Sequence, residues 1–346
     1  MTQFQQAIET AQPVAAVIIS VALMLFSGFL MTRITKLLRL PNVTAYIVAG
    51  ILIGPYCLDL VPQRIISGTD FLSDIALAFI AFSTGEFFKL SVLKKSGMKV
   101  VWITLFEAVL ASVFVFVLTY FVFRLELAFS IVLAALASAT APASTMMTIR
   151  QTGAKGDFVD TLLQVVALDD VVGLVLYSVA ISVALASLGG SRGFSFETLV
   201  KPVLLNLAAL ALGGLFGLVM KLLMPARRST DNKLIISVAL LFAFCGVCTL
   251  LDVSPLLGCM AMGTVYTNVA ENDKLFKQLG YFSPPILLLF FVRSGMNFKL
   301  DALFSASGSL NGVPLIAVGV GYFLVRIVGK YIGAWVGCAA VKKDRL

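Results

Sequence analysis

The sequence contains no histidine, and only 13% of its residues are Asp, Glu, Lys or Arg. Because histidine is the one side chain that ordinarily changes its charge near neutral pH, proton chemistry here must fall to carboxylates or lysines. A soluble domain carries about 25% charged residues. Hydrophobic residues make up 60% of this chain. The composition therefore excludes an ordinary soluble protein and predicts an all-α polytopic membrane protein.

Cysteine is also scarce, with five residues scattered along the chain. The close pair Cys245 and Cys248 falls inside an apolar segment, where small residues let helices approach each other. We therefore expect no disulfide, no metal site and no cofactor. The net charge of +8 comes from Lys and Arg in short loops that form no basic stripe, so nucleic acid is not an expected partner.

Long apolar runs divide the chain into segments that can cross a lipid bilayer as helices, which takes roughly 17 to 25 residues each. About eleven such spans can be placed, at residues 13–36, 42–60, 70–90, 98–123, 127–149, 158–187, 197–224, 233–251, 255–271, 280–298 and 312–341. The loops between them are short. The function is therefore expected to reside in the membrane helices themselves.

Basic residues are distributed unevenly between the two sides of these spans. The loops after odd-numbered spans, with the C-terminus, contain Arg33, Lys36, Arg39, Lys89, Lys94, Lys95, Lys99, Arg150, Lys155, Lys221, Arg227, Arg228, Lys233, Lys274, Lys277, Lys342, Lys343 and Arg345. The loops after even-numbered spans contain only Arg64, Arg124, Arg192, Lys201, Arg293 and Lys299. Since basic loops stay in the cytoplasm, we expect a multi-pass protein of the cell membrane with its N-terminus outside and its C-terminus inside.

Two adjacent carboxylates, Asp169 and Asp170, interrupt the apolar segment 158–187. A charged side chain at bilayer depth costs at least about 2.5–3.5 kcal/mol, and such residues are by default functional. The alternative is that one aspartate is neutral and both only join neighbouring helices. A single Asn or Ser would do that at lower cost, so we expect the pair to form the functional site.

The fifth span contains a proline among small and hydroxylated residues, in the sequence ASATAPAST of residues 137–145. Pro142 removes a backbone donor and clashes with the preceding turn, which predicts a helix that opens around Thr140 to Ala143. An opened helix presents carbonyl oxygens and two helix ends at the membrane midplane, as in the ion sites of secondary transporters. The alternative is an ordinary proline kink.

The eleventh span carries two cations, Arg326 and Lys330, which share one helical face. Cations at this spacing repel each other unless acidic groups face them. Lysine can lose its proton when it is desolvated and arginine cannot, so Lys330 is the better titrating partner and Arg326 the better structural one. Snorkelling to the cytoplasmic surface is the alternative for both.

Besides the two aspartates, two glutamates are candidate partners for these cations. Glu107 lies within the fourth span and either contacts Arg326 or lines the pathway; the sequence leaves both roles open. Glu86 lies nearer a helix end, where an interfacial pair with Lys89 is expected.

Together these motifs resemble the monovalent cation:proton antiporters, specifically the bacterial sodium/proton exchanger type with adjacent aspartates. The similarity includes the early Pro…Gly-Pro helix (40–55), the Gly-x-Glu-like helix end at Gly85-Glu86, and the Phe-Phe…Gly segment (289–296). ALDD (167–170) together with GKYIG (329–333) is the most specific pair. It resembles the ion-binding aspartates and the lysine that pairs with them.

The resemblance implies a transporter, not an enzyme, with an inverted-repeat fold and a discontinuous helix. It implies scaffold and dimerisation helices at 1–96 and 232–305, core transport helices at 97–190, a linker helix at 191–231 and a core helix at 306–346. Asp169, Asp170 and Thr140 would bind the cation or protons, with Lys330, Arg326 and Glu107 in pairing or tuning roles. The broken-helix residues are Ala141, Pro142, Ala143 and Ser144.

Two departures from the family pattern stand out. Ala141 occupies the place where the best-known members have an aspartate after the threonine, so the cation can be Na⁺, Li⁺ or K⁺, with Na⁺ expected. The second repeat stops after its first helix, which suggests a C-terminally truncated product. The competing hypotheses are a sodium-coupled solute symporter of the related bile-acid type, which the two aspartates oppose, and an inactive truncated antiporter.

Overall fold

A computed structural model of the chain describes residues 12–38, 40–91, 97–187, 196–225, 227–251, 253–270, 274–301 and 309–342. Its helices, in chain order, are α2 (Pro13–Leu37), α3 (Asn42–Ile53), α4 (Gln63–Gly68), α5 (Phe71–Thr84), η1 (Gly85–Phe88), α7 (Met98–Phe116), η2 (Val117–Val122), α8 (Leu127–Ser138), α9 (Pro142–Thr152), α10 (Asp157–Ser187), α11 (Phe196–Leu223), α12 (Thr230–Leu250), α13 (Leu256–Val269), α14 (Lys274–Phe282), α15 (Pro284–Met296) and α17 (Leu315–Ala340). A short antiparallel ribbon of β1 (Ser309–Leu310) and β2 (Val313–Pro314) precedes α17.

Within the described residues, seven helices are long and apolar enough to cross a membrane. An eighth crossing results if α14 and α15, which are bent by 48° relative to each other, act as one span. The shorter apolar helices α3, α8 and α13 coincide with the other predicted spans. Every predicted span thus contains a helix, and the polytopic all-helical fold is confirmed, whereas the total of about eleven crossings stays a prediction.

The predicted spans at 42–60 and 127–149 are not continuous helices in the structure, in addition to the bend between α14 and α15. The span at 42–60 was expected to be helical throughout, but α3 ends at Ile53 because Gly54 precedes Pro55 and adopts an extended conformation. The fifth span is divided into α8 and α9. Of the basic residues used to predict orientation, the following lie outside the described residues: Arg39, Lys94, Lys95, Arg192, Lys343 and Arg345.

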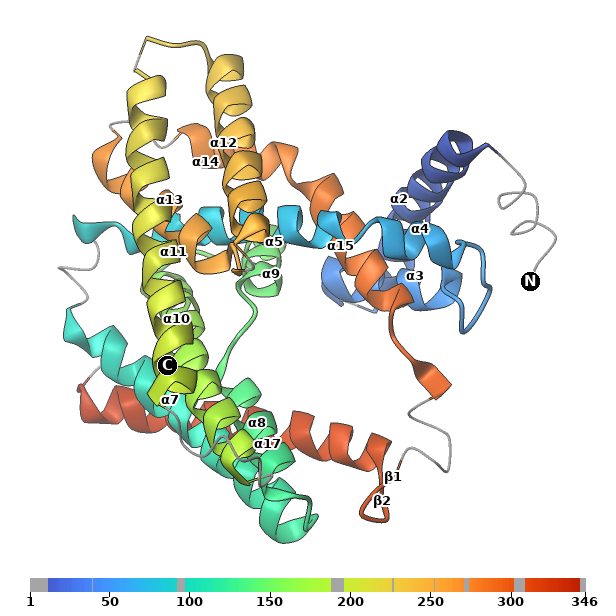
Figure 1. The fold of residues 1–346 in the computed structure, drawn as a ribbon, viewed down its shortest axis with the longest axis vertical. Coiled ribbons are helices and arrows are strands. Elements are labelled where there is room, and N and C mark those ends of the chain that lie inside the picture. Colours follow the sequence, from blue (N-terminus) through green and yellow to red (C-terminus); the bar gives the residue numbers. More distant parts are fainter. Residues whose placement is uncertain are drawn as a thin grey trace.

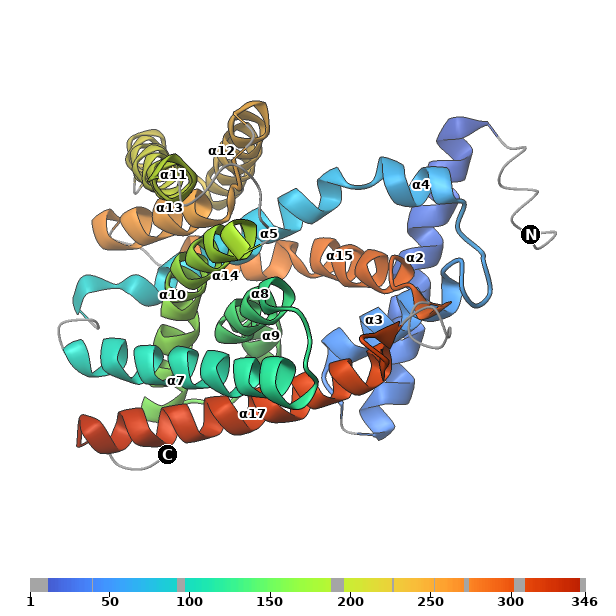
Figure 2. The ribbon, with the colours of Figure 1, turned by 60° about the horizontal axis from the view of Figure 1, so that its bottom comes forward.

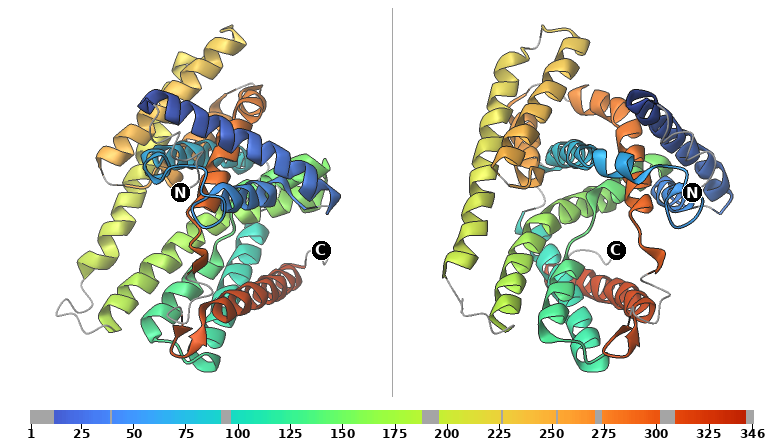
Figure 3. Two further views of the ribbon diagram at one scale, coloured as in Figure 1. Left: turned by 90° about the vertical axis from the view of Figure 1, so that its right-hand side faces the viewer. Right: turned by 45° about the vertical axis from the view of Figure 1, so that its right-hand side comes forward.

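The helices form two main groups. In the lower part of Figure 1, α7, α8, α10 and α17 pack on one another, and Figure 2 shows α7 and α17 side by side along most of their length. In the other group, α11 packs on α13 and α13 on α5, while α15 packs on α2 and α3. The right-hand view of Figure 3 separates α11 and α12, in yellow, from α2, in dark blue. Helix α10 contacts both groups through α11 and η1.

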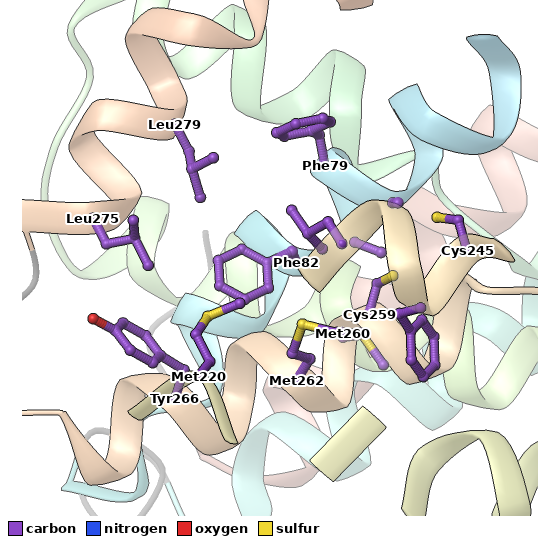
Figure 4. Packing of buried hydrophobic residues seen from close by; sticks show 14 of the residues in the cluster. Phe79, Phe82, Met220, Cys245, Cys259, Met260, Met262, Tyr266, Leu275 and Leu279 are labelled. Atoms are coloured by element: carbon purple, nitrogen blue, oxygen red, sulfur yellow. The ribbon is translucent and has the colours of Figure 1, made fainter. Parts of the chain in front are cut away.

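A hydrophobic cluster joins α5 to α11, α12, α13 and α14 in the second group (Figure 4). Phe82 is fully buried and stacks on Phe276 of α14, with ring centroids 5.2 Å apart. Phe79, one turn earlier, is also buried, and Met220 and Met262 fill the space beside the rings. Flexible methionines suit such irregular gaps between helices that cross at different angles. These contacts join α5 to the neighbouring helices α11, α13 and α14.

Three glycines at four-residue intervals let α17 approach α7 closely. A Cβ atom at Gly333 would lie 2.6 Å from the Cα of Glu107, and one at Gly337 would lie 2.8 Å from the Cα of Ile103. At Gly329 the corresponding atom is the Cα of Ala111, at 2.8 Å. Small residues at this spacing are a common means of close helix packing in membranes. The glycines therefore set the distance between the two helices.

We expect Gly333→Ala to lower the apparent melting temperature of the purified protein in detergent. The added methyl group meets backbone that cannot yield, and such overpacking typically costs about 1–3 kcal/mol. Gly319→Ala is the matched control, because no atom lies within 4 Å of a Cβ atom at Gly319 in the same helix. Equal melting temperatures for the two variants would show that the contact between α7 and α17 is looser than described.

Candidate ion-binding site

Asp169 and Asp170 lie near the middle of α10 and meet different surroundings. Successive residues of an α-helix point about 100° apart. Asp169 is 0% exposed, whereas Asp170 is half-buried. Among the described residues, no hydrogen bond or ion pair reaches the side chain of Asp170. The two carboxylates are therefore not equivalent.

The helix break lies directly against Asp169. Ala139, Thr140 and Ala141 are non-helical, and the backbone of Ala139 and Ala141 is extended. The hydroxyl of Thr140 donates to Oδ2 of Asp169 at 2.7 Å. A Cβ atom at Gly173, one turn after Asp169, would lie 3.0 Å from the Cβ of Ala139. Glycine at this position therefore lets the break approach α10.

The break begins earlier than the proline alone predicts. Pro142, Ala143 and Ser144 were expected in the open segment, but they form the first turn of α9. Proline suits that position, because its missing N–H would have no partner in a first turn and its φ angle is helical. Of the four predicted broken-helix residues, only Ala141 lies in the open segment.

Lys330 extends from α17 into the centre of this site. Its Nζ lies 2.9 Å from Oδ2 of Asp169 and 2.8 Å from Oε1 of Glu107. It also donates to the carbonyl oxygen of Ser138, the last residue of α8, at 2.6 Å. An ammonium group has three N–H donors. All three therefore have an acceptor, and the lysine does not snorkel to a membrane surface.

Glu107 contacts Lys330 and forms no ion pair with Arg326 within the described residues. It is only 8% exposed. It also borders a cavity of about 320 Å³ lined mainly by aliphatic and aromatic side chains of α7, α10 and α17. Of the two roles that the sequence left open, contact with Arg326 is thus wrong, because Arg326 sits one turn earlier on α17 and faces the helix break.

Arg326 binds backbone carbonyls, where an acidic partner was expected. Its Nε donates to the carbonyl oxygen of Ala137 at 3.1 Å, and its Nη2 donates to that of Ala139 at 2.5 Å. The last carbonyls of a helix lack partners within the helix and carry its negative dipole end. Arg326 and Lys330 together therefore cap the C-terminus of α8, which also explains how two cations on one helical face coexist.

Two carboxylate oxygens in the site are buried without a hydrogen-bond partner among the described residues, Oδ1 of Asp169 and Oε2 of Glu107. One lysine thus serves two buried acids, each with one uncommitted oxygen. Such a site can hold a proton or coordinate a cation, but it cannot bury all of its negative charge uncompensated. Glu86, in η1, lies away from this cluster on the rim of another cavity with Arg150 and Lys277.

We expect Arg326→Lys to destabilise the protein although it keeps the positive charge. A lysine cannot reproduce the planar fork of arginine, so one carbonyl at the break loses its donor, which typically costs about 1–3 kcal/mol. The measurement is the apparent melting temperature in detergent, with Arg227→Lys, at an exposed position outside the site, as the control. A melting temperature equal to that of the control variant would contradict the capping role.

Comparisons with known proteins bear on the family and the fold of this chain. The pattern of the family described as "Sodium/hydrogen exchanger, transmembrane" matches residues 19–345. The structure of the sodium proton antiporter MjNhaP1 from Methanocaldococcus jannaschii at pH 8 is similar with a TM-score of 0.72 and 19% identity, covering 96% of this chain and 80% of that one. A second structure of MjNhaP1, from an electron-microscopy map, is similar with a TM-score of 0.69 and 18% identity. The match covers 96% of this chain and 79% of that one. No curated protein sequence matches.

At this level of identity the structural likeness shows the fold, which is the antiporter fold predicted from the sequence motifs. The family pattern extends over nearly the whole chain. Its members are transporters and not enzymes, and they exchange a monovalent cation for protons. The chain belongs to the sodium/hydrogen exchanger family.

Proposed function

We propose that this antiporter exchanges Na⁺ for protons by alternating access at Asp169 and Asp170, with Li⁺ and K⁺ as the other candidate cations. The observation that carries the proposal is the position of Asp169. It is completely buried, lies at the break between α8 and α9, and is held by both Thr140 and Lys330. A buried carboxylate at a broken helix is a recurrent ion site in secondary transporters.

Competition between cation and proton follows from the charges. A cation requires ionised carboxylates, whereas protons neutralise them, so one site cannot hold both at once. Asp170 is half-buried and unpaired among the described residues, which makes it the proposed direct ligand of the cation. Asp169 is the proposed partner that Lys330 holds while the site lacks a cation.

Thr140 and Arg326 have supporting roles in this proposal. The Thr140 hydroxyl fixes the orientation of the Asp169 carboxylate, and its oxygen is also a suitable cation ligand. Arg326 keeps the helix break open by binding its carbonyls. Since Ala141 supplies no carboxylate, the choice among Na⁺, Li⁺ and K⁺ would depend on Asp169, Asp170 and the backbone at the break.

The proposed transport core and scaffold correspond to the two groups of helices. We place the transport core in residues 97–190 and 306–346, the scaffold in residues 1–96 and 232–305, and the linker in residues 191–231. The packing of α7, α8, α10 and α17 supports the core, and the cluster around α5 supports the scaffold. We place the dimer contact on the scaffold, and the protein in the cell membrane. The family assignment favours neither the solute symporter nor the inactive chain.

The first functional prediction concerns three of the charged residues of the site, Asp169, Asp170 and Lys330. In proteoliposomes, Asp170→Asn should reduce sodium-driven proton movement to the level of empty vesicles at every pH, because it removes the proposed cation ligand. Asp169→Asn should also be severe, because Lys330 loses its partner. Lys330→Ala should retain some exchange with a changed pH dependence. The measurement is the internal pH after a sodium gradient is imposed.

Asp301→Asn, at an exposed position outside the site, is the control for these variants. It should transport like the unmodified protein. Normal sodium-driven proton movement in Asp170→Asn would defeat the proposed assignment of the cation ligand. A requirement for an added organic solute would instead indicate symport.

A further prediction concerns the orientation of the chain in the membrane. In a cysteine-free background, a cysteine introduced near Arg227 or Lys94 should react with a membrane-impermeant thiol reagent only from the cytoplasmic side. One introduced near Ser191 should react only from outside, because the basic loops are expected inside. Lys94 and Ser191 lie outside the described residues. The reverse labelling pattern would place the N-terminus in the cytoplasm.

A further inference from the structure

Lys330 is shared between two acids that come from different helices. Its Nζ lies 2.8 Å from Oε1 of Glu107 on α7 and 2.9 Å from Oδ2 of Asp169 on α10. We propose that Glu107 is a positioning residue that keeps Lys330 protonated when a cation occupies Asp169 and Asp170. This inference rests on the proposed exchange function. Lys330 then keeps its proton throughout the exchange cycle, and this proton is not one of those exchanged for the cation.

The geometry supports this role because two of the three acceptors of Lys330 do not belong to Asp169. When a cation binds Asp169, the ammonium group of Lys330 loses one of its three acceptors. Glu107 and the carbonyl oxygen of Ser138, at 2.6 Å, still accept from it. The negative charge of Glu107 also offsets the repulsion between the ammonium group and the cation, which is strong between buried like charges.

The other charged groups around Glu107 cannot replace it. Arg326 is bound to the carbonyls of Ala137 and Ala139, and residues 127–138 of α8 include no ionisable side chain. Tyr331 and Cys338 of α17 border the same cavity as Glu107 and are neutral in their ordinary forms. In this proposal the carboxylate of Asp169 binds the cation and is no longer the counter-charge of Lys330. Glu107 is then the remaining counter-charge for Lys330 among the described residues.

Glu107 is also held in place by the packing of its own backbone. Its Cα lies against Gly333, which shares a face of α17 with Lys330 one turn away. The carboxylate is 8% exposed. It therefore remains beside the lysine for as long as α7 and α17 stay packed together.

Removing the charge of Glu107 is expected to change the number of protons exchanged per cation. In Glu107→Gln, cation binding at Asp169 leaves Lys330 a buried ammonium group beside a positive ion with no counter-charge. The ammonium group then releases its proton to the solvent on the side from which the cation entered, and the neutral amine takes up a proton after the cation has left on the other side. We expect about one additional proton to be exchanged per cation, since the ammonium group has one proton to lose.

The experiment counts protons in two ways. Proton release on adding Na⁺ to the purified protein in detergent is measured with a pH dye. The number of protons exchanged per Na⁺ is measured in proteoliposomes from the membrane potential at which a fixed sodium gradient drives no proton flux. Glu107→Gln should raise both numbers by about one proton per Na⁺. Glu126→Gln, an exposed glutamate before α8, is the matched control and should change neither number.

A second background separates this role from a merely structural one. Arginine does not lose its proton in proteins, so in a Lys330→Arg background the substitution Glu107→Gln should leave proton release unchanged. If Glu107→Gln is not stable in detergent, Glu107→Asp takes its place. Its shorter side chain holds Lys330 less closely and should raise proton release above that of the unmodified protein.

The outcomes that overturn the inference differ from those that overturn the proposed function. Proton release in Glu107→Gln or Glu107→Asp equal to that of the unmodified protein would refute the role of Glu107 and leave antiport intact. The same increase in the Lys330→Arg background would also refute it, because the extra proton would then have another source. Absence of any sodium-dependent proton release in the unmodified protein would refute the proposed function instead.

Discussion

The structure depends on how two cations and two acids are accommodated at the depth of the membrane. Each buried charge is costly alone, and removing the partner of a buried charge is more costly still. Lys330 meets this constraint with three acceptors, two of them carboxylates. Arg326 meets it with two carbonyl oxygens. Removing Lys330 would leave the carboxylates of Asp169 and Glu107 without their shared counter-charge, and removing Arg326 would leave the carbonyl oxygens at the end of α8 without a donor.

The broken helix and the helix that carries the cations therefore support each other. An α8 that ended inside a bilayer without partners would expose unpaired carbonyls, at several kcal/mol each. Arg326 and Lys330 supply those partners, and the carbonyls in turn supply acceptors that the two cations need. The glycines of α17 bring the helix close enough to α7 for Lys330 to reach both Glu107 and the break. Close packing is thus a condition for the charge arrangement.

Much of this site could be predicted from local sequence. Asp169, Asp170 and Lys330 stand out because charge is rare in apolar segments, and Pro142 marks the break because it cannot continue a helix. The partner of Glu107 could not be predicted, because it depends on the rotation of α7 relative to α17 and α10. The stripe of glycines on α17 was the available signal, since it marks the face that meets another helix. Helix lengths were overestimated where an apolar run continues past a Gly-Pro turn, as it does after Ile53.

Asp169 and Asp170 have different roles in the proposed site. Both anchors of Asp169 act on the same oxygen, Oδ2, while Oδ1 is buried without a partner among the described residues. A cation that approaches Oδ1 and the half-buried Asp170 would weaken the attraction between Asp169 and Lys330 without first breaking the bond to Thr140. The carboxylate then keeps its orientation while its counter-charge changes. In the proposed exchange, the carboxylate of Asp169 would stay fixed between the cation and the ammonium group of Lys330, and Glu107 would continue to accept from that ammonium group.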